Sequence, residues 1–122
     1  QKIMFYRLAV IKMAVYAIIS GKDNQTSLAY FKSKKISQNN RVPVARLKQL
    51  VQVLSAGDVV HVVSVDRFPS VGVFVAFVDA VLKAGAIMKI LEQSYLDVGN
   101  GKYYRQSVAE HLKVLAALDN MK

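Results

Sequence analysis

The sequence predicts an α/β fold of three layers, in which a mostly parallel sheet carries helices on both faces. Three observations predict it. Segments with strand character alternate with segments of helix character, in the order β-α-β-α-β-α-β-α. The chain has 122 residues and is 53% hydrophobic, which suits one domain with one core. Glycine or proline stands at most of the expected helix ends.

The first half of the chain is expected to form a strand, a helix and a second strand. Residues 2–10 are aromatic and aliphatic, as in a buried strand. Residues 11–20 lack alternation and precede Gly21, a natural helix stop, so they are expected to be helical. Their β-branched content leaves a strand as the alternative. Residues 27–37 are expected to form the next strand, which ends in a basic loop.

The second half has clearer punctuation. A helix is expected from Pro43, which suits a first helical turn, to Gly57. Its apolar face has the spacing i, i+3, i+4 and i+7, at Leu47, Leu50, Val51 and Leu54.

A third strand, a helix and a fourth strand follow. The valine-rich residues 58–65 predict the strand, in which His61 is expected to be a core histidine. The helix is expected between Pro69 and Gly85, and the next strand at 86–94. A last helix, 102–122, is still running where the sequence stops. We therefore expect residues 1–122 to be a single domain and a fragment that ends within this helix.

Composition narrows the function. The net charge of +9 favours a polyanionic partner, most often nucleic acid. The absence of cysteine excludes disulfides and thiolate metal sites, and two isolated histidines make a zinc site unexpected, so we expect no metal. Charged residues interrupt every apolar run, and no secretory signal is evident. A cytoplasmic protein without a membrane span is expected.

Charged residues are expected at the carboxyl edge of the sheet, where ligands of such folds bind. Arg7, Arg41 and Arg67 would meet there, and three guanidinium groups could hold one DNA phosphodiester. Asp66 would orient Arg67 or handle a leaving-group proton. The alternative is that the arginines are solvated surface charges and that Asp66 caps the helix after Pro69.

The order of motifs from Arg41 to Ser94 resembles the catalytic domain of the serine recombinases, the resolvase/invertase family. The matching elements are Arg41-Val-Pro43, Gly57-Asp58, an apolar strand, Val65-Asp66-Arg67-Phe68-Pro69-Ser70, and Gly85-Ala86 followed by IMKIL. The resemblance implies a flavodoxin-like sheet and site-specific DNA recombination through a 5′-phosphoserine linkage. It also implies arginines around the phosphate, no cofactor, and a homodimer or synaptic tetramer formed through the C-terminal helix.

The family places its serine after the first strand in a Tyr-x-Arg-x-Ser pattern, and two registers fit it. One uses Phe5, Arg7 and Ala9, and the other uses Tyr16, Ile18 and Ser20. From Ser20 to Arg41 there are 21 residues, which is too short for a helix of about 11 residues, a strand of about 5 and their loops at average lengths.

The register with Ala9 at the nucleophile position is therefore favoured, and Ser20 is the alternative nucleophile. Alanine has no oxygen to attack phosphorus, so the cutting step is expected to be impaired. Ser70 in place of the family's second arginine points the same way.

Basic residues where the expected second strand gives way to a loop extend the expected DNA contact. Lys32, Lys34 and Lys35 either contact DNA phosphates or form an ordinary basic loop. Another class of function stays open, a non-catalytic α/β dimerisation module that modulates a recombinase or another partner.

Overall fold

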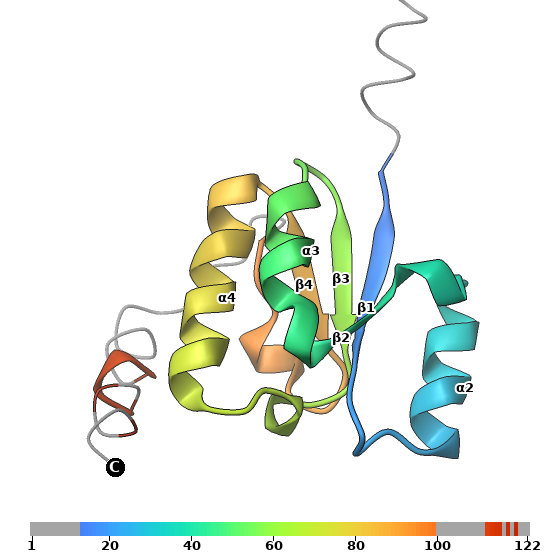
Figure 1. The fold of residues 1–122 in the computed structure, drawn as a ribbon, viewed down its shortest axis with the longest axis horizontal. Helices are drawn as coiled ribbons and strands as arrows, with labels where there is room; N and C mark the ends of the chain where they lie inside the picture. Colours follow the sequence, from blue (N-terminus) through green and yellow to red (C-terminus); the bar gives the residue numbers. More distant parts are fainter. Residues whose placement is uncertain (1–12, 100–111, 116, 118, 120–122) are drawn as a thin grey trace, which may run out of the picture.

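The computed structural model describes residues 13–99, 112–115, 117 and 119 (Figure 1). Its four strands form one parallel sheet in the order β2-β1-β3-β4. They are β1 (Val15–Ile19), β2 (Arg41–Pro43), β3 (Val59–Val62) and β4 (Ile87–Ile90). This order equals the first four strands of the flavodoxin-like arrangement. The expected α/β class with a parallel sheet is confirmed.

Helices lie on both faces of the sheet, as Figure 1 shows. Helix α2 (Gln25–Ser33) covers one face, and helices α3 (Leu47–Val53) and α4 (Val71–Ala84) cover the other. Neighbouring residues of β1 point to opposite faces, because side chains alternate along a strand. Ala17 packs in a cluster with Phe31 of α2, whereas Ile18 packs with the α3 and α4 side. The three expected layers are present.

The larger core lies between the sheet and helices α3 and α4. Aromatic side chains fill its centre, where the Phe68 ring lies 5.2 Å from that of Phe74 in an edge-to-face contact. Fully buried side chains of β3, α4 and β4 surround them, among them Val60, Val62, Val81, Met88 and Ile90. The packing of strands β3 and β4 under α4 fixes the loop that follows β3.

The first half of the chain differs from the sequence-based expectation. The helix expected at 11–20 is wrong, because β1 occupies Val15–Ile19. A central strand that is covered on both faces reads as a continuous apolar run, so it lacks the alternation of a half-exposed strand. The β-branched side chains of this run were the better signal. The strand expected at 2–10 lies outside the described residues.

The strand expected at 27–37 is also wrong, because helix α2 occupies Gln25–Ser33. Asn24 caps the helix, and its side-chain oxygen accepts a hydrogen bond from the Ser27 backbone N–H at 3.1 Å. Ser27 and Phe31 are buried one turn apart, which gives the helix its inner face. The cap and the i, i+4 pair were the signals that the strand interpretation overlooked.

The second half follows the expectation more closely. Helix α4 begins after Ser70, whose Oγ accepts from Val73 N–H, and ends at Gly85 with a φ of 73°. Strand β3 lies within the expected 58–65, and β4 within 86–94. Residues 112–115 are helical, as expected for that part of the chain.

The start of the helix expected from Pro43 is corrected. Pro43 ends β2, a 3₁₀ turn occupies Val44–Arg46, and α3 begins only at Leu47. Proline suits an edge strand as well as a first helical turn. At both places the backbone N–H that proline lacks would have no partner within the sheet or the helix.

Replacing Phe31 with alanine tests the helical placement of α2. Removal of the buried ring should lower the free energy of unfolding by about 3–5 kcal/mol, because a cavity replaces the ring. Leu28→Ala, on the same helix but 46% exposed, should cost about 0.5 kcal/mol or less. Urea unfolding followed by circular dichroism measures both. Equal losses would contradict the orientation of α2.

Candidate functional site

The carboxyl ends of β1 and β3 form the topological switch point of the sheet. From β1 the chain passes through α2 on one face to β2, and from β2 it passes through α3 on the opposite face to β3. The loops after β1 and β3 therefore diverge, and such crevices bind ligands in open α/β sheets. Ser20 follows β1 directly, and Asp66 and Arg67 follow β3.

Arg67 lies at the centre of the contacts at this edge. Its Nε donates to Asp23 Oδ1 at 2.9 Å, and its Nη1 donates to Asp66 Oδ1 at 2.7 Å. Its Nη2 lies 3.5 Å from Ser27 Oγ. The side chains of Arg67 and Asp23 are each 9% exposed, whereas Asp66 is 57% exposed. Arg67 thus has a buried carboxylate partner and a solvent-facing one.

Ser20 and Lys22 complete a ring of contacts with these residues. The Ser20 backbone N–H donates to Asp23 Oδ2 at 2.8 Å, and Ser20 Oγ accepts from the Lys22 backbone N–H at 3.2 Å. The Lys22 ammonium donates to the Asp66 carbonyl oxygen at 3.0 Å. Because Asp23 binds both Ser20 and Arg67, it ties the loop after β1 to the loop after β3.

The loop that carries Asp66 and Arg67 is held from the other side by Gln93, which follows β4. Gln93 Oε1 accepts from Val65 N–H at 2.9 Å and from Ser64 Oγ at 3.3 Å. The residues Val65–Arg67 form a 3₁₀ turn after Ser64. These bonds fix the direction in which the Asp66 and Arg67 side chains leave the sheet.

The charges of the cluster balance, because two cations face two carboxylates. Burial alone would raise the pKa of Asp66, but the hydrogen bond with Ser64 and the charges of Arg67 and Lys22 outweigh it and lower this pKa. Desolvation would lower the pKa of Arg67, but Asp23 and Asp66 raise it. At neutral pH Asp66 is thus a carboxylate and a weak base, which suits orientation of Arg67 better than proton transfer.

The structure brings together some of the residues expected at this edge. Asp66 and Arg67 lie there as a hydrogen-bonded pair. The interpretation of Asp66 as the cap of α4 is wrong, because Ser70 caps that helix.

Arg41 makes its contacts away from this edge: its Nε and Nη2 donate to Ile36 O at 3.2 and 3.0 Å. Arg41 therefore braces the connection between α2 and β2.

The chain-length argument that favoured Ala9 is wrong. The 21 residues from Ser20 to Arg41 hold the nine-residue α2, and β2 begins at Arg41 itself. Both elements are shorter than the average lengths on which the argument depended. Ser20 consequently stands directly after β1. Arg7 and Ala9 lie outside the described residues.

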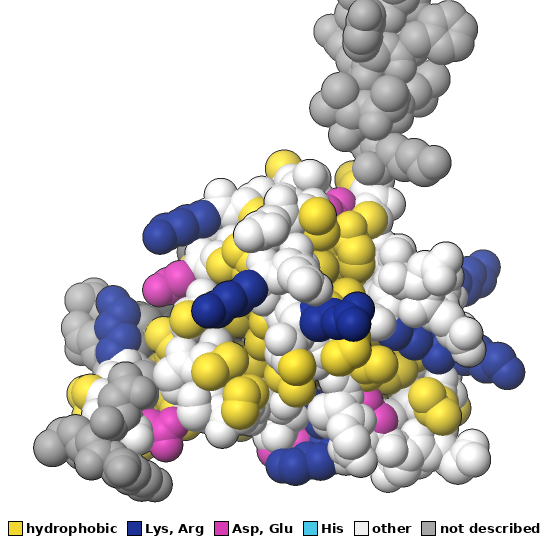
Figure 2. All heavy atoms as spheres, in the orientation of Figure 1, with side chains coloured by type: hydrophobic (Ala, Val, Ile, Leu, Met, Phe, Trp, Pro, Cys, Tyr) yellow, Lys and Arg dark blue, Asp and Glu magenta, His cyan; other side chains and the backbone are white. Residues whose placement is uncertain are grey.

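The three expected lysines are exposed around the end of α2. Lys32 lies in its last turn, Lys34 is its C-cap residue, and Lys35 has a left-handed φ of 57°. Figure 2 shows basic side chains projecting on the α2 side of the molecule. Solvent surrounds these cations, so they are available to an anionic partner.

Sequence reasoning missed Lys22, Asp23 and Ser27 at this site. The signal was the polar run SGKDN, which follows the apolar run VYAII. Polar residues at the end of a strand mark the carboxyl edge, but the same residues after a helix are typical of a helix stop, which is what the helix expected at 11–20 implies.

Neither a scan against models of protein families nor a search of curated proteins finds a match for this chain. Among the described residues, histidine and acidic side chains nowhere gather in threes in a way that could hold a metal ion. In the same part of the chain, no helix has both the length and the apolar composition that a membrane crossing needs.

A second polar contact joins α2 to β3 beneath the site. His61 is buried, as expected for a core histidine, and its Nδ1 lies 3.0 Å from the Tyr30 hydroxyl. Burial lowers the pKa of His61, and the nearby charges of Lys34 and Lys89 lower it further. The neutral imidazole is therefore the form that the folded protein prefers.

Stability should fall in mild acid because of His61. The unfolded chain takes up a proton near pH 6.5 and the folded chain only at lower pH, so unfolding gains protons between these two values. The urea midpoint should be highest above about pH 7 and should decline as the pH falls toward the folded pKa. His61→Gln should flatten this decline, because it removes the group whose pKa burial lowers. If the decline is unchanged in His61→Gln, protonation of His61 is not its cause.

Proposed function

We propose that this domain cleaves and rejoins DNA in the manner of the serine recombinases it resembles, with Ser20 as the nucleophile. One observation carries the proposal. Ser20 leaves β1 at the switch point, and Asp23 ties its backbone to Arg67 at the same edge. The arrangement of a serine after the first strand and an Asp-Arg pair after the third supports the register with Tyr16, Ile18 and Ser20 over that with Ala9.

The reaction is a transesterification. Ser20 Oγ loses its proton and forms a bond to phosphorus, while the bond from phosphorus to the DNA 3′ oxygen breaks and that oxygen takes up a proton. One phosphodiester replaces another, so no cofactor or energy source is needed. Reversal with a different 3′ hydroxyl would complete strand exchange.

Arg67 is suited to hold the phosphate in this step. Asp23 occupies its buried Nε side, while the exposed Asp66 occupies Nη1. An incoming phosphate can reach Arg67 Nη1 from the solvent side by replacing the Asp66 carboxylate, which is 57% exposed. Lys22, 63% exposed, supplies a second cation on that side. Arg67 would then stabilise the charge of the transition state.

The departures from the family pattern predict slow chemistry. Ile18 stands where the family has an arginine, and it is fully buried in the core. Ser70 stands where the family has another arginine, and it serves as a helix cap. Each lost donor to developing charge costs about 10²–10³ in rate. The same departures favour the second candidate, a dimerisation module without activity, in which the Asp23–Arg67 pair is structural.

A covalent adduct on Ser20 distinguishes the two candidates. The full-length protein would be incubated with genomic DNA of its source, denatured, digested with nuclease and protease, and analysed by mass spectrometry. A nucleotide linked through phosphate to Ser20 is expected in the unaltered protein and in Ser37→Ala, and it should be absent in Ser20→Ala.

An adduct on another residue would refute the Ser20 register. Complete absence of adduct, with a stable dimer in solution, would favour the non-catalytic module.

A further inference from the structure

One stretch of the chain is free of acidic residues. Between Asp23 and Asp58 the sequence has no aspartate or glutamate, but six basic residues, Lys32, Lys34, Lys35, Arg41, Arg46 and Lys48. This stretch forms α2, β2 and α3. Because β2 is an edge strand of the sheet, the acid-free stretch is concentrated at this edge. The β2 edge is here defined as β2 with the parts of α2 and α3 that flank it.

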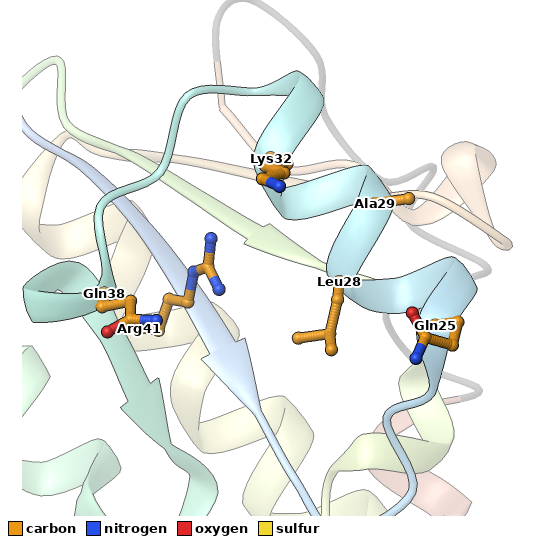
Figure 3. Close-up of a pocket in the computed structure, with 6 residues that line it drawn as sticks. All are labelled: Gln25, Leu28, Ala29, Lys32, Gln38 and Arg41. Atoms are coloured by element: carbon orange, nitrogen blue, oxygen red, sulfur yellow. The ribbon is translucent and has the colours of Figure 1, made fainter.

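A hollow of about 430 Å³ separates α2 from the start of β2 (Figure 3). Lys32 comes from the helix wall and Arg41 from the strand wall, and Gln25 and Gln38 add amide groups. Leu28 reaches into the space between the two walls, as Figure 3 shows. Two basic and two amide residues thus line the hollow together with the apolar residues Leu28 and Ala29, and no carboxylate is in the lining.

A neighbouring hollow of about 290 Å³ lies on the other side of Arg41, toward α3. Arg46 lines this hollow, together with the amide residues Asn39 and Gln49. Arg41 lies in the lining of both hollows. Its Nε and Nη2 are fixed by Ile36 O, and nothing among the described residues accepts from Nη1. Cations therefore recur along the β2 edge, from Lys32 through Arg41 to Arg46.

We propose that the β2 edge binds the sugar-phosphate backbone of DNA. Lysine, arginine, glutamine and asparagine side chains are the usual donors to phosphate oxygens. A row of cations without acids fits a polymer with regularly repeated anions, and counterions released from it would drive binding. The balanced charges around Arg67 give little long-range attraction, so the β2 edge provides the attraction that the switch point lacks. The inference shares its DNA partner with the proposed function but requires no cleavage by Ser20.

The test compares two double variants with equal loss of charge. Lys32→Gln/Arg46→Gln removes cations from the β2 edge. Lys83→Gln/Lys89→Gln is the matched control: Lys83 lies in the last turn of α4, as Lys32 does in α2, and all four side chains are exposed.

Binding of a fluorescent duplex of mixed sequence would be measured by anisotropy between about 50 and 200 mM salt, in full-length protein carrying Ser20→Ala. The slope of log K against log salt should shrink by about 2 in the β2-edge variant and stay unchanged in the control. The charge-conserving pair Lys32→Arg/Arg46→Lys should keep the original slope.

Equal slopes in the β2-edge variant and the unaltered protein would overturn the inference, as would equal reductions in both double variants. Binding of polyglutamate would be measured as well. If polyglutamate binding depends on Lys32 and Arg46 but the salt slope of DNA binding does not, the inference is overturned in favour of an acidic protein partner. A Ser20 adduct obtained alongside unchanged slopes would leave the proposed function standing and defeat only this inference.

Discussion

The buried ion pair between Asp23 and Arg67 holds together the two loops that leave the central strands of the sheet. Removing two charges from water costs several kcal/mol per ion, and their attraction offsets this only when their remaining hydrogen-bonding groups are satisfied. Here Asp23 also accepts from the Ser20 backbone, and Arg67 also donates to Asp66. The pair is thus embedded in a network, and the positions of Ser20 and Asp66 depend on it.

Strand order makes this network possible. Parallel pairing of β1 with β3 places their carboxyl ends side by side, although Asp23 and Arg67 are 44 residues apart in sequence. Two regions of the molecule differ in their balance of charge. The switch point holds balanced charges around a serine, and the β2 edge holds the unbalanced positive charge.

The sequence was sufficient for the fold class and for the second half of the chain. Ser70 and Gly85 are local signals for the two ends of α4, and the valine run is a local signal for β3. The residues that follow β3 could therefore be placed at the edge of the sheet. The first half failed because β1 is covered on both faces and shows no alternation, and Gly21 resembled a helix stop. The preference for Ala9 over Ser20 depended on average element lengths, and α2 and β2 are shorter than these. The Asp23–Arg67 contact joins distant loops and has no local signature, so a single sequence does not reveal it.

A double-mutant cycle on Asp23 and Arg67 tests the central claim most directly. Asp23→Asn, Arg67→Gln and the double variant would be compared by urea unfolding at neutral pH, beside the same cycle on the exposed pair Lys22 and Asp66. The buried pair should show a coupling of about 2–3 kcal/mol, because each single change leaves an uncompensated buried charge. The exposed pair should show about 1 kcal/mol or less. A coupling for Asp23 and Arg67 no larger than that for Lys22 and Asp66 would contradict the account.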